Sequence, residues 1–185
     1  MTDPLTGRLL VAVPGLLDPN FRRSVVLVLD HGEDGAFGVV INRPLEVDVD
    51  AVLPSWQALA TPPARLFQGG PVGLDGAIGV VLVPDGEEPP DGVDRVAGPF
   101  CLVDLDAVPD ALVGQVADLR VFAGHSGWSG GQVEAEIAAG DWFVVDADER
   151  DPFSLVPERL WGQVLRRQGG DLALLANAPD DPRLN

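Results

Sequence analysis

The sequence contains no lysine, one cysteine and two histidines, and each shortage excludes a kind of chemistry. All 12 basic residues are arginines, so a Schiff base, a Walker-type phosphate lysine and Ser–Lys catalysis are excluded. Cys101 cannot form an intrachain disulfide, and its apolar neighbours predict a buried, inert thiol. One cysteine cannot build a zinc site, and we expect neither a metal nor a cofactor.

Acidic residues are abundant: 29 Asp and Glu side chains give a formal net charge of −17. Such a charge opposes nucleic acid, because neutralisation of phosphates supplies most non-specific affinity. The N-terminus lacks the basic start of a secretory signal, and apolar runs such as residues 77–84 are too short to cross a membrane. We therefore expect a soluble cytoplasmic protein that binds neither nucleic acid nor membranes directly.

The length of 185 residues and the absence of repeats indicate one domain, residues 1–185, of mixed strands and helices. Residues 24–30 and 36–42 are apolar almost throughout and flank a five-residue loop that ends in Asp-Gly. They predict an antiparallel hairpin that is covered on both faces. Further strands are expected at 8–13, 65–68, 77–83, 100–104, 118–123 and 141–146, and helices at 132–139, at 157–168, around Trp56 and, weakly, at 109–116.

A glycine-rich segment, residues 124–131, carries the sharpest enzymatic signal. It follows a predicted strand, precedes a predicted helix and contains the G-x-S-x-G pattern of a nucleophile elbow around Ser129. A hydrolase of that type needs a later histidine, but His31 and His125 both come earlier. Ser129 and Gln132 have the spacing of a capping box, so we interpret Ser129 as a helix cap.

The same segment could bind an anion, since a glycine-rich turn that opens a helix exposes backbone N–H groups. Glycines that only permit tight packing are the alternative. Arg43 ends a buried strand, where it could face a ligand or hold loop carbonyls or carboxylates. The candidate ligand-binding residues are Asn42, Arg43, Gly69, Gly70, Gly127, Trp128, Ser129, Gly130, Gly131 and Gln132; no catalytic residue and no metal ligand is assigned.

Acidic side chains elsewhere are interpreted as solvent-facing. His31, Glu33 and Asp34 share one hairpin loop, but without a second ligand cluster a solvated turn is favoured over a metal site. Glu134 and Glu136 are two residues apart on a predicted helix, so they face different ways. We expect solvent exposure for both and no catalytic carboxylate pair.

Several segments together resemble the YqgE/AlgH family of bacterial proteins, and the resemblance covers nearly the whole chain. The segments are residues 7–14 (GRLLVAVP), 18–21 with 24–28 (DPNF, SVVLV), 38–44 (GVVINRP), 68–72 (QGGPV), 124–134 (GHSGWSGGQVE), Trp142 and 161–185. The resemblance implies a bent, mixed sheet closed into a pseudo-barrel with helices outside. It implies little about chemistry, although one branch is named for a proposed role as a regulator of alginate production. His125 stands where many members have tyrosine, which argues against a catalytic histidine there.

The leading functional hypothesis is a non-enzymatic binding or regulatory module that acts through a small-molecule or protein partner. The alternative is a hydrolase or transferase that uses the turn at residues 124–132. An enzyme of that kind needs a base within reach of Ser126 or Ser129, and only a histidine or a carboxylate is available.

The charge pattern predicts that duplex DNA is not bound with a Kd below about 10⁻⁴ M at physiological salt. The arginines are scattered, with adjacent pairs only at Arg22-Arg23 and Arg166-Arg167, and no segment reads as a recognition helix. Gel shifts and fluorescence anisotropy at about 150 mM salt measure this directly. A sequence-selective, salt-sensitive complex at micromolar protein would contradict the prediction and restore direct transcriptional control.

Overall fold

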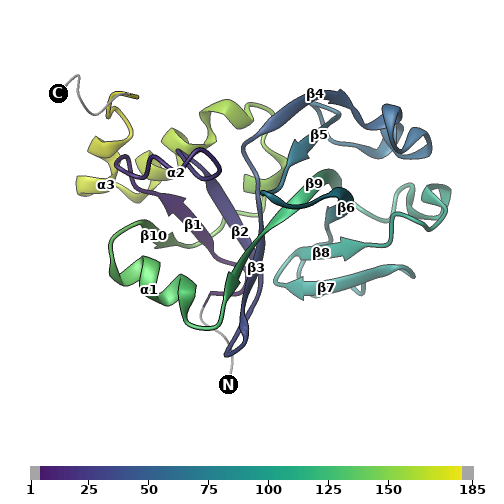
Figure 1. Ribbon diagram of the computed structural model, residues 1–185. Helices are drawn as coiled ribbons and strands as arrows, with labels where there is room; N and C mark the ends of the chain where they lie inside the picture. The colour runs from purple at the N-terminus through teal and green to yellow at the C-terminus, as the bar shows by residue number, and fades with distance from the viewer. Residues whose placement is uncertain (1–4, 181–185) are drawn as a thin grey trace.

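One mixed sheet of ten strands organises the chain, and the computed structural model describes residues 5–180 (Figure 1). The strands are β1 (Leu9–Ala12), β2 (Val25–Gly32), β3 (Gly35–Val40), β4 (Pro44–Asp48), β5 (Arg65–Gln68), β6 (Val72–Leu82), β7 (Val93–Ala97), β8 (Phe100–Val103), β9 (Asp118–Ser129) and β10 (Trp142–Val145). Their main order is β10-β1-β2-β3-β9-β6-β8-β7, while β5 joins β4 to β9. Among these strands, only β5 and β9 pair in parallel, which makes the sheet mixed.

The sheet curls into a half-barrel with its helices outside, so the expected architecture is confirmed (Figure 1). The α-helices are α1 (Gln132–Ala138), α2 (Leu160–Gln168) and α3 (Gly170–Leu175). Short 3-10 helices occupy Val49–Ala51, Pro54–Leu59, Pro109–Leu112, Asp151–Phe153 and Pro157–Arg159. None of the helices between residues 5 and 180 has the length and apolar character that crossing a membrane requires.

The half of the sheet built by β1, β2 and β3 is covered on both faces. Alternate residues of β2 point to opposite sides, so Val25 and Leu27 pack in the core that includes Trp161 of α2, while Val26 and Val28 pack with Val133 of α1. This is why the strands are apolar almost throughout instead of alternating with polar residues.

The predicted hairpin of β2 and β3 is confirmed, with a tighter turn than expected. Both strands extend toward each other until Gly32 pairs with Gly35, so the connection is Glu33-Asp34 instead of five residues. The helix expected at 109–116 is reduced to the 3-10 turn Pro109–Leu112. Two strands were not foreseen, β4 and β7, which are short and carry charged, partly exposed residues.

Strand β9 departs most from expectation, because it does not end at residue 123 but continues to Ser129. Its first half pairs with β6 and β5, and its second half pairs with β3 from Ser126 to Ser129. Pairing with β3 gives the backbone of residues 126–129 hydrogen-bond partners in the sheet, so this part of the glycine-rich segment is extended instead of turned. The turn before α1 is confined to Gly130 and Gly131.

Candidate functional site

Three aromatic rings and one carboxylate form a closed cluster between β9, α1 and β10, which we call the indole cluster: Phe21, Trp128, Glu136 and Trp142. The Nε1 atoms of Trp128 and Trp142 each donate to Oε2 of Glu136 at 2.9 Å. Phe21 stacks on Trp128 at a centroid distance of 5.9 Å and meets the Trp142 ring edge-on at 5.5 Å. The expectation that Glu136 faces solvent is therefore wrong, because its carboxylate accepts from two largely buried indoles.

Gln132 links this cluster to the end of β9. Its side-chain nitrogen donates to Oε1 of Glu136 at 3.0 Å, and its side-chain oxygen accepts the backbone N–H of Ser129 at 3.0 Å. The backbone contact is one half of a capping box. The other half is absent, since the Ser129 hydroxyl faces the Gln132 oxygen at 3.3 Å and the N-cap residue is Gly131, with a φ of 79°. Ser129 is thus not the cap of α1.

Gly69 and Gly70 lie where β3, β5 and β9 meet. A Cβ atom on Gly69 would come within 2.4 Å of the Gly124 carbonyl oxygen, and one on Gly70 within 2.1 Å of the His125 oxygen. Gly69 also donates its N–H to Ala123 and accepts the buried Ser126 hydroxyl at 3.0 Å. Glycine is required here by the close approach of two backbones.

Asn42 and Arg43 hold the segment that precedes β2, which we call the 18–23 loop. Asn42 accepts the Val25 N–H at 3.0 Å and donates to the Arg23 carbonyl at 2.9 Å. The Arg43 guanidinium donates to the carbonyls of Pro19, Asn20 and Arg22, the last at 2.6 Å. Burial lowers the pKa of Arg43, partly offset by the Asp18 carboxylate, yet an arginine remains charged at neutral pH.

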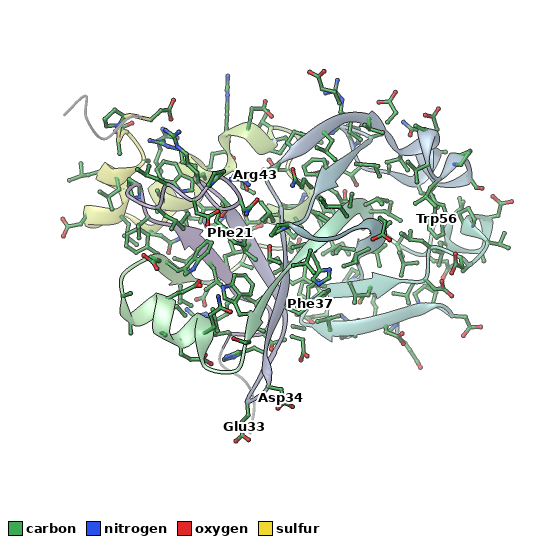
Figure 2. The ribbon with its side chains drawn as sticks, in the orientation of Figure 1. Phe21, Glu33, Asp34, Phe37, Arg43 and Trp56 are labelled. Carbon is green, nitrogen blue, oxygen red and sulfur yellow. The ribbon has the colours of Figure 1, made fainter. Side chains whose placement is uncertain are left out.

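The 18–23 loop connects two regions of the molecule. Phe21 enters the indole cluster, and Figure 2 shows it on the same side as Arg43, at the opposite end of β3 from Glu33 and Asp34. Two residues later, Arg23 has a φ of 52°; among residues 5–180 it is the one non-glycine residue with positive φ. Its guanidinium carbon lies 4.4 Å from the centre of the Trp161 ring on α2.

The hairpin tip carries the acidic residues that could have suggested a metal. Glu33 and Asp34 point away from the sheet at the free end of the hairpin (Figure 2). His31 is hydrogen-bonded to Glu134 of α1, so it is directed away from that tip. Between residues 5 and 180, no three His, Cys, Asp or Glu side chains are grouped so that they could hold a metal ion.

The candidate ligand-binding residues thus occupy three places. Asn42 and Arg43 bind the 18–23 loop, Gly69 and Gly70 lie where two backbone segments cross, and residues 127–132 lie at the indole cluster or its edge. Gly127 lies within β9 with open space around it, and Gly130 passes so close to Glu33 that a Cβ would lie 2.5 Å from its carbonyl oxygen. Sequence reasoning missed Glu136 as the acceptor of both indoles, and the tryptophans on either side of it were the available signal. Direct contact of these residues with a ligand stays a prediction.

Glu136→Ala should lower the free energy of unfolding by about 2–4 kcal/mol, because two indole N–H groups lose their acceptor in a largely buried place. Ser129→Ala is the matched control in the same network. It keeps the backbone N–H that Gln132 binds, so it should cost less than about 0.5 kcal/mol. Urea unfolding followed by tryptophan fluorescence measures both variants. A larger loss for Ser129→Ala than for Glu136→Ala would contradict the assignment of Glu136 as the centre of the cluster.

Known proteins resemble this chain over nearly its whole length. A UPF0301 protein of Streptomyces coelicolor is 56% identical over 184 residues, which cover 98% of this chain and 95% of that protein. The crystal structure of a Corynebacterium diphtheriae protein is similar with a TM-score of 0.89 and 35% identity, over 95% of this chain and 93% of that one. The solution structure of the AlgH protein from Pseudomonas aeruginosa, a UPF0301 protein, has a TM-score of 0.71 at 30% identity, with 97% of both chains covered. The family model described as AlgH-like matches residues 9–173, and the chain therefore belongs to the AlgH-like family.

Proposed function

We propose that this protein is a non-enzymatic binding module of the cytoplasm, which acts through a small-molecule or protein partner and binds it at the outer side of the 18–23 loop. One observation carries the proposal: the left-handed backbone of Arg23, with a φ of 52°. Arginine in this conformation costs about 1–2 kcal/mol relative to ordinary backbone. Such strain persists where the surrounding structure enforces it, and it is concentrated at ligand clamps and active sites.

Contacts from neighbouring residues fix the 18–23 loop and enforce the strained backbone conformation of Arg23. Asn42 binds the carbonyl of Arg23 itself, Arg43 binds the carbonyl of Arg22, and Phe21 is anchored between two tryptophans. These contacts leave the Arg23 side chain directed toward α2, beside Trp161. The framework thus presents one arginine at a defined place, which suits recognition of a partner.

The serine hydroxyls near the glycine-rich segment support binding over catalysis. The Ser126 hydroxyl is fully buried and donates to the Gly69 carbonyl. The Ser129 hydroxyl lies 3.3 Å from the Gln132 amide oxygen, which cannot act as a base. His125 packs its ring against Phe37 at 4.8 Å, and His31 is bonded to Glu134. The hydroxyl groups are therefore engaged in structural contacts.

The test is recovery of a partner from the native host. Tagged wild-type protein, Arg23→Gly and Arg65→Ala are expressed in the host, cross-linked or gently purified, and analysed by native mass spectrometry for bound small molecules and proteins. We expect a stoichiometric partner on wild type and on Arg65→Ala, which changes an exposed arginine of β5, and its loss from Arg23→Gly.

Arg23→Ala provides the control for folding and strain. Both variants lose the same side-chain contacts, but glycine accepts a φ of 52° and alanine does not, so Arg23→Gly should be about 1 kcal/mol more stable than Arg23→Ala. Recovery of the same partner on Arg23→Gly would reject the proposed binding surface. Labelling of Ser126 or Ser129 by a serine-directed fluorophosphonate would favour the hydrolase alternative instead.

A further inference from the structure

A hollow of about 510 Å³ lies next to the 18–23 loop, between Arg23 and the face of α2. Three arginine side chains line it: Arg23 from the loop, Arg159 from the turn that leads into α2, and Arg166 from α2 itself. Trp161 and Gln163 complete much of the remaining wall. In a chain with a net charge of −17, a quarter of the 12 arginines therefore meet at one place.

The positive charge of this hollow is largely uncompensated. Among residues 5–180, neither Arg159 nor Arg166 forms a side-chain hydrogen bond or ion pair, although the chain has 29 acidic residues. Glu158 is the acidic residue on the lining, and it forms no ion pair with these arginines. The distant acidic surface matters little here, because charges beyond about 8 Å are screened at physiological salt.

Helix stability does not explain where Arg159 lies, whereas Arg166 is in the last turn of α2, where the helix dipole favours a cation. Arg159 is the N-cap residue of α2, at the positive end of the helix dipole, where a cation is unfavourable and an anion is favoured. Arg166 folds back over Gly162, since a Cβ there would lie 3.2 Å from its Nη1 atom. Glycine is a poor residue for a helix interior, and at this position it leaves room for a guanidinium against the helix.

The chain itself shows that the edge of the hollow accepts an oxyanion. The Asp180 carboxylate lies 3.1 Å from Nε of Arg23, and Nη2 of Arg23 donates to the Ala178 carbonyl at 2.7 Å. The Asp180 side chain is 86% exposed, so this ion pair is weak and an incoming anion can replace it.

We infer that this hollow is a binding site for a small organic anion that carries a phosphate group; the inference rests on the proposed function and names the ligand class of the same surface. Guanidinium groups bind phosphate through paired N–H donors, and a phosphate offers three peripheral oxygens and nearly two charges to several arginines at once. A single carboxylate can form hydrogen bonds with only one or two of these arginines. The volume exceeds that of a bare phosphate and matches sites for small organic ligands.

The inference is tested by titration of the full-length protein with inorganic pyrophosphate, by calorimetry at about 150 mM salt. We expect saturable binding at one site. Arg159→Gln combined with Arg166→Gln should weaken it about tenfold or more, because charge-assisted hydrogen bonds are lost. Arg65→Gln, an exposed arginine outside the hollow, should leave it unchanged. Asp180→Asn should tighten binding about two- to fivefold, because the competing carboxylate is removed.

Three results would overturn the site: no saturable binding to wild type, equal binding to the double variant, or citrate bound as tightly as pyrophosphate. The exchanged side chains of Arg159 and Arg166 are exposed, and circular dichroism with thermal unfolding verifies that the variants fold. If pyrophosphate fails while a host partner is still lost from Arg23→Gly, the phosphate site is rejected and the binding module remains. If pyrophosphate binds but no host partner depends on Arg23, the phosphate site is retained and the proposed binding module is rejected.

Discussion

The structure depends on one strand that pairs with two different sets of neighbours. Strand β9 lies between β6 and β5 along its first half and against β3 along its second. The change of partner requires that its backbone pass within contact distance of residues 69 and 70, which leaves no space for a Cβ atom at either position. Glycines on both backbone segments satisfy this requirement, and the buried Ser126 hydroxyl adds a hydrogen bond between them. Because β3 and α1 are both attached to the second half of β9, the placement of the hairpin, the helix and the indole cluster follows from this crossing.

From that crossing, a chain of contacts leads to the 18–23 loop. Strand β9 contributes Trp128 to the indole cluster, and the cluster anchors Phe21. The connection between β3 and β4 supplies Asn42 and Arg43, whose side chains bind the loop carbonyls. Each contact is ordinary, but together they fix both ends of a six-residue segment and hold its last residue in a left-handed conformation. Four of the segments that resemble the family, residues 18–21, 38–44, 68–72 and 124–134, are parts of this one framework.

Much of the fold could be predicted because its signals are local. The hairpin of β2 and β3 and the helices α1 and α2 follow from apolar runs and helical periodicity. The extension of β9 could not be predicted, because glycines at 124, 127, 130 and 131 favour a turn, and the non-local pairing with β3 keeps Gly127 in a strand. Arg120 is a second example: it is 1% exposed and donates to the carbonyls of Thr61, Pro62, Pro152 and Ser154, while burial lowers its pKa to about 10. Nothing near it in the sequence distinguishes it from a surface arginine.

The arginine-lined hollow was beyond sequence reasoning for the same reason, since Arg23 is far in sequence from Arg159 and Arg166. In the sequence, none of the three arginines stands out from the others, and the net charge of −17 points away from any anionic partner. The negative net charge and the local cluster of arginines are compatible, because they act over different distances. A nucleic acid presents a row of phosphates along a surface and meets the summed repulsion of many carboxylates. A small anion inside a hollow interacts with the charges within a few ångströms, and salt screens the rest. Overall charge therefore argues against an extended polyanion here, while the local arrangement of arginines favours a single small one.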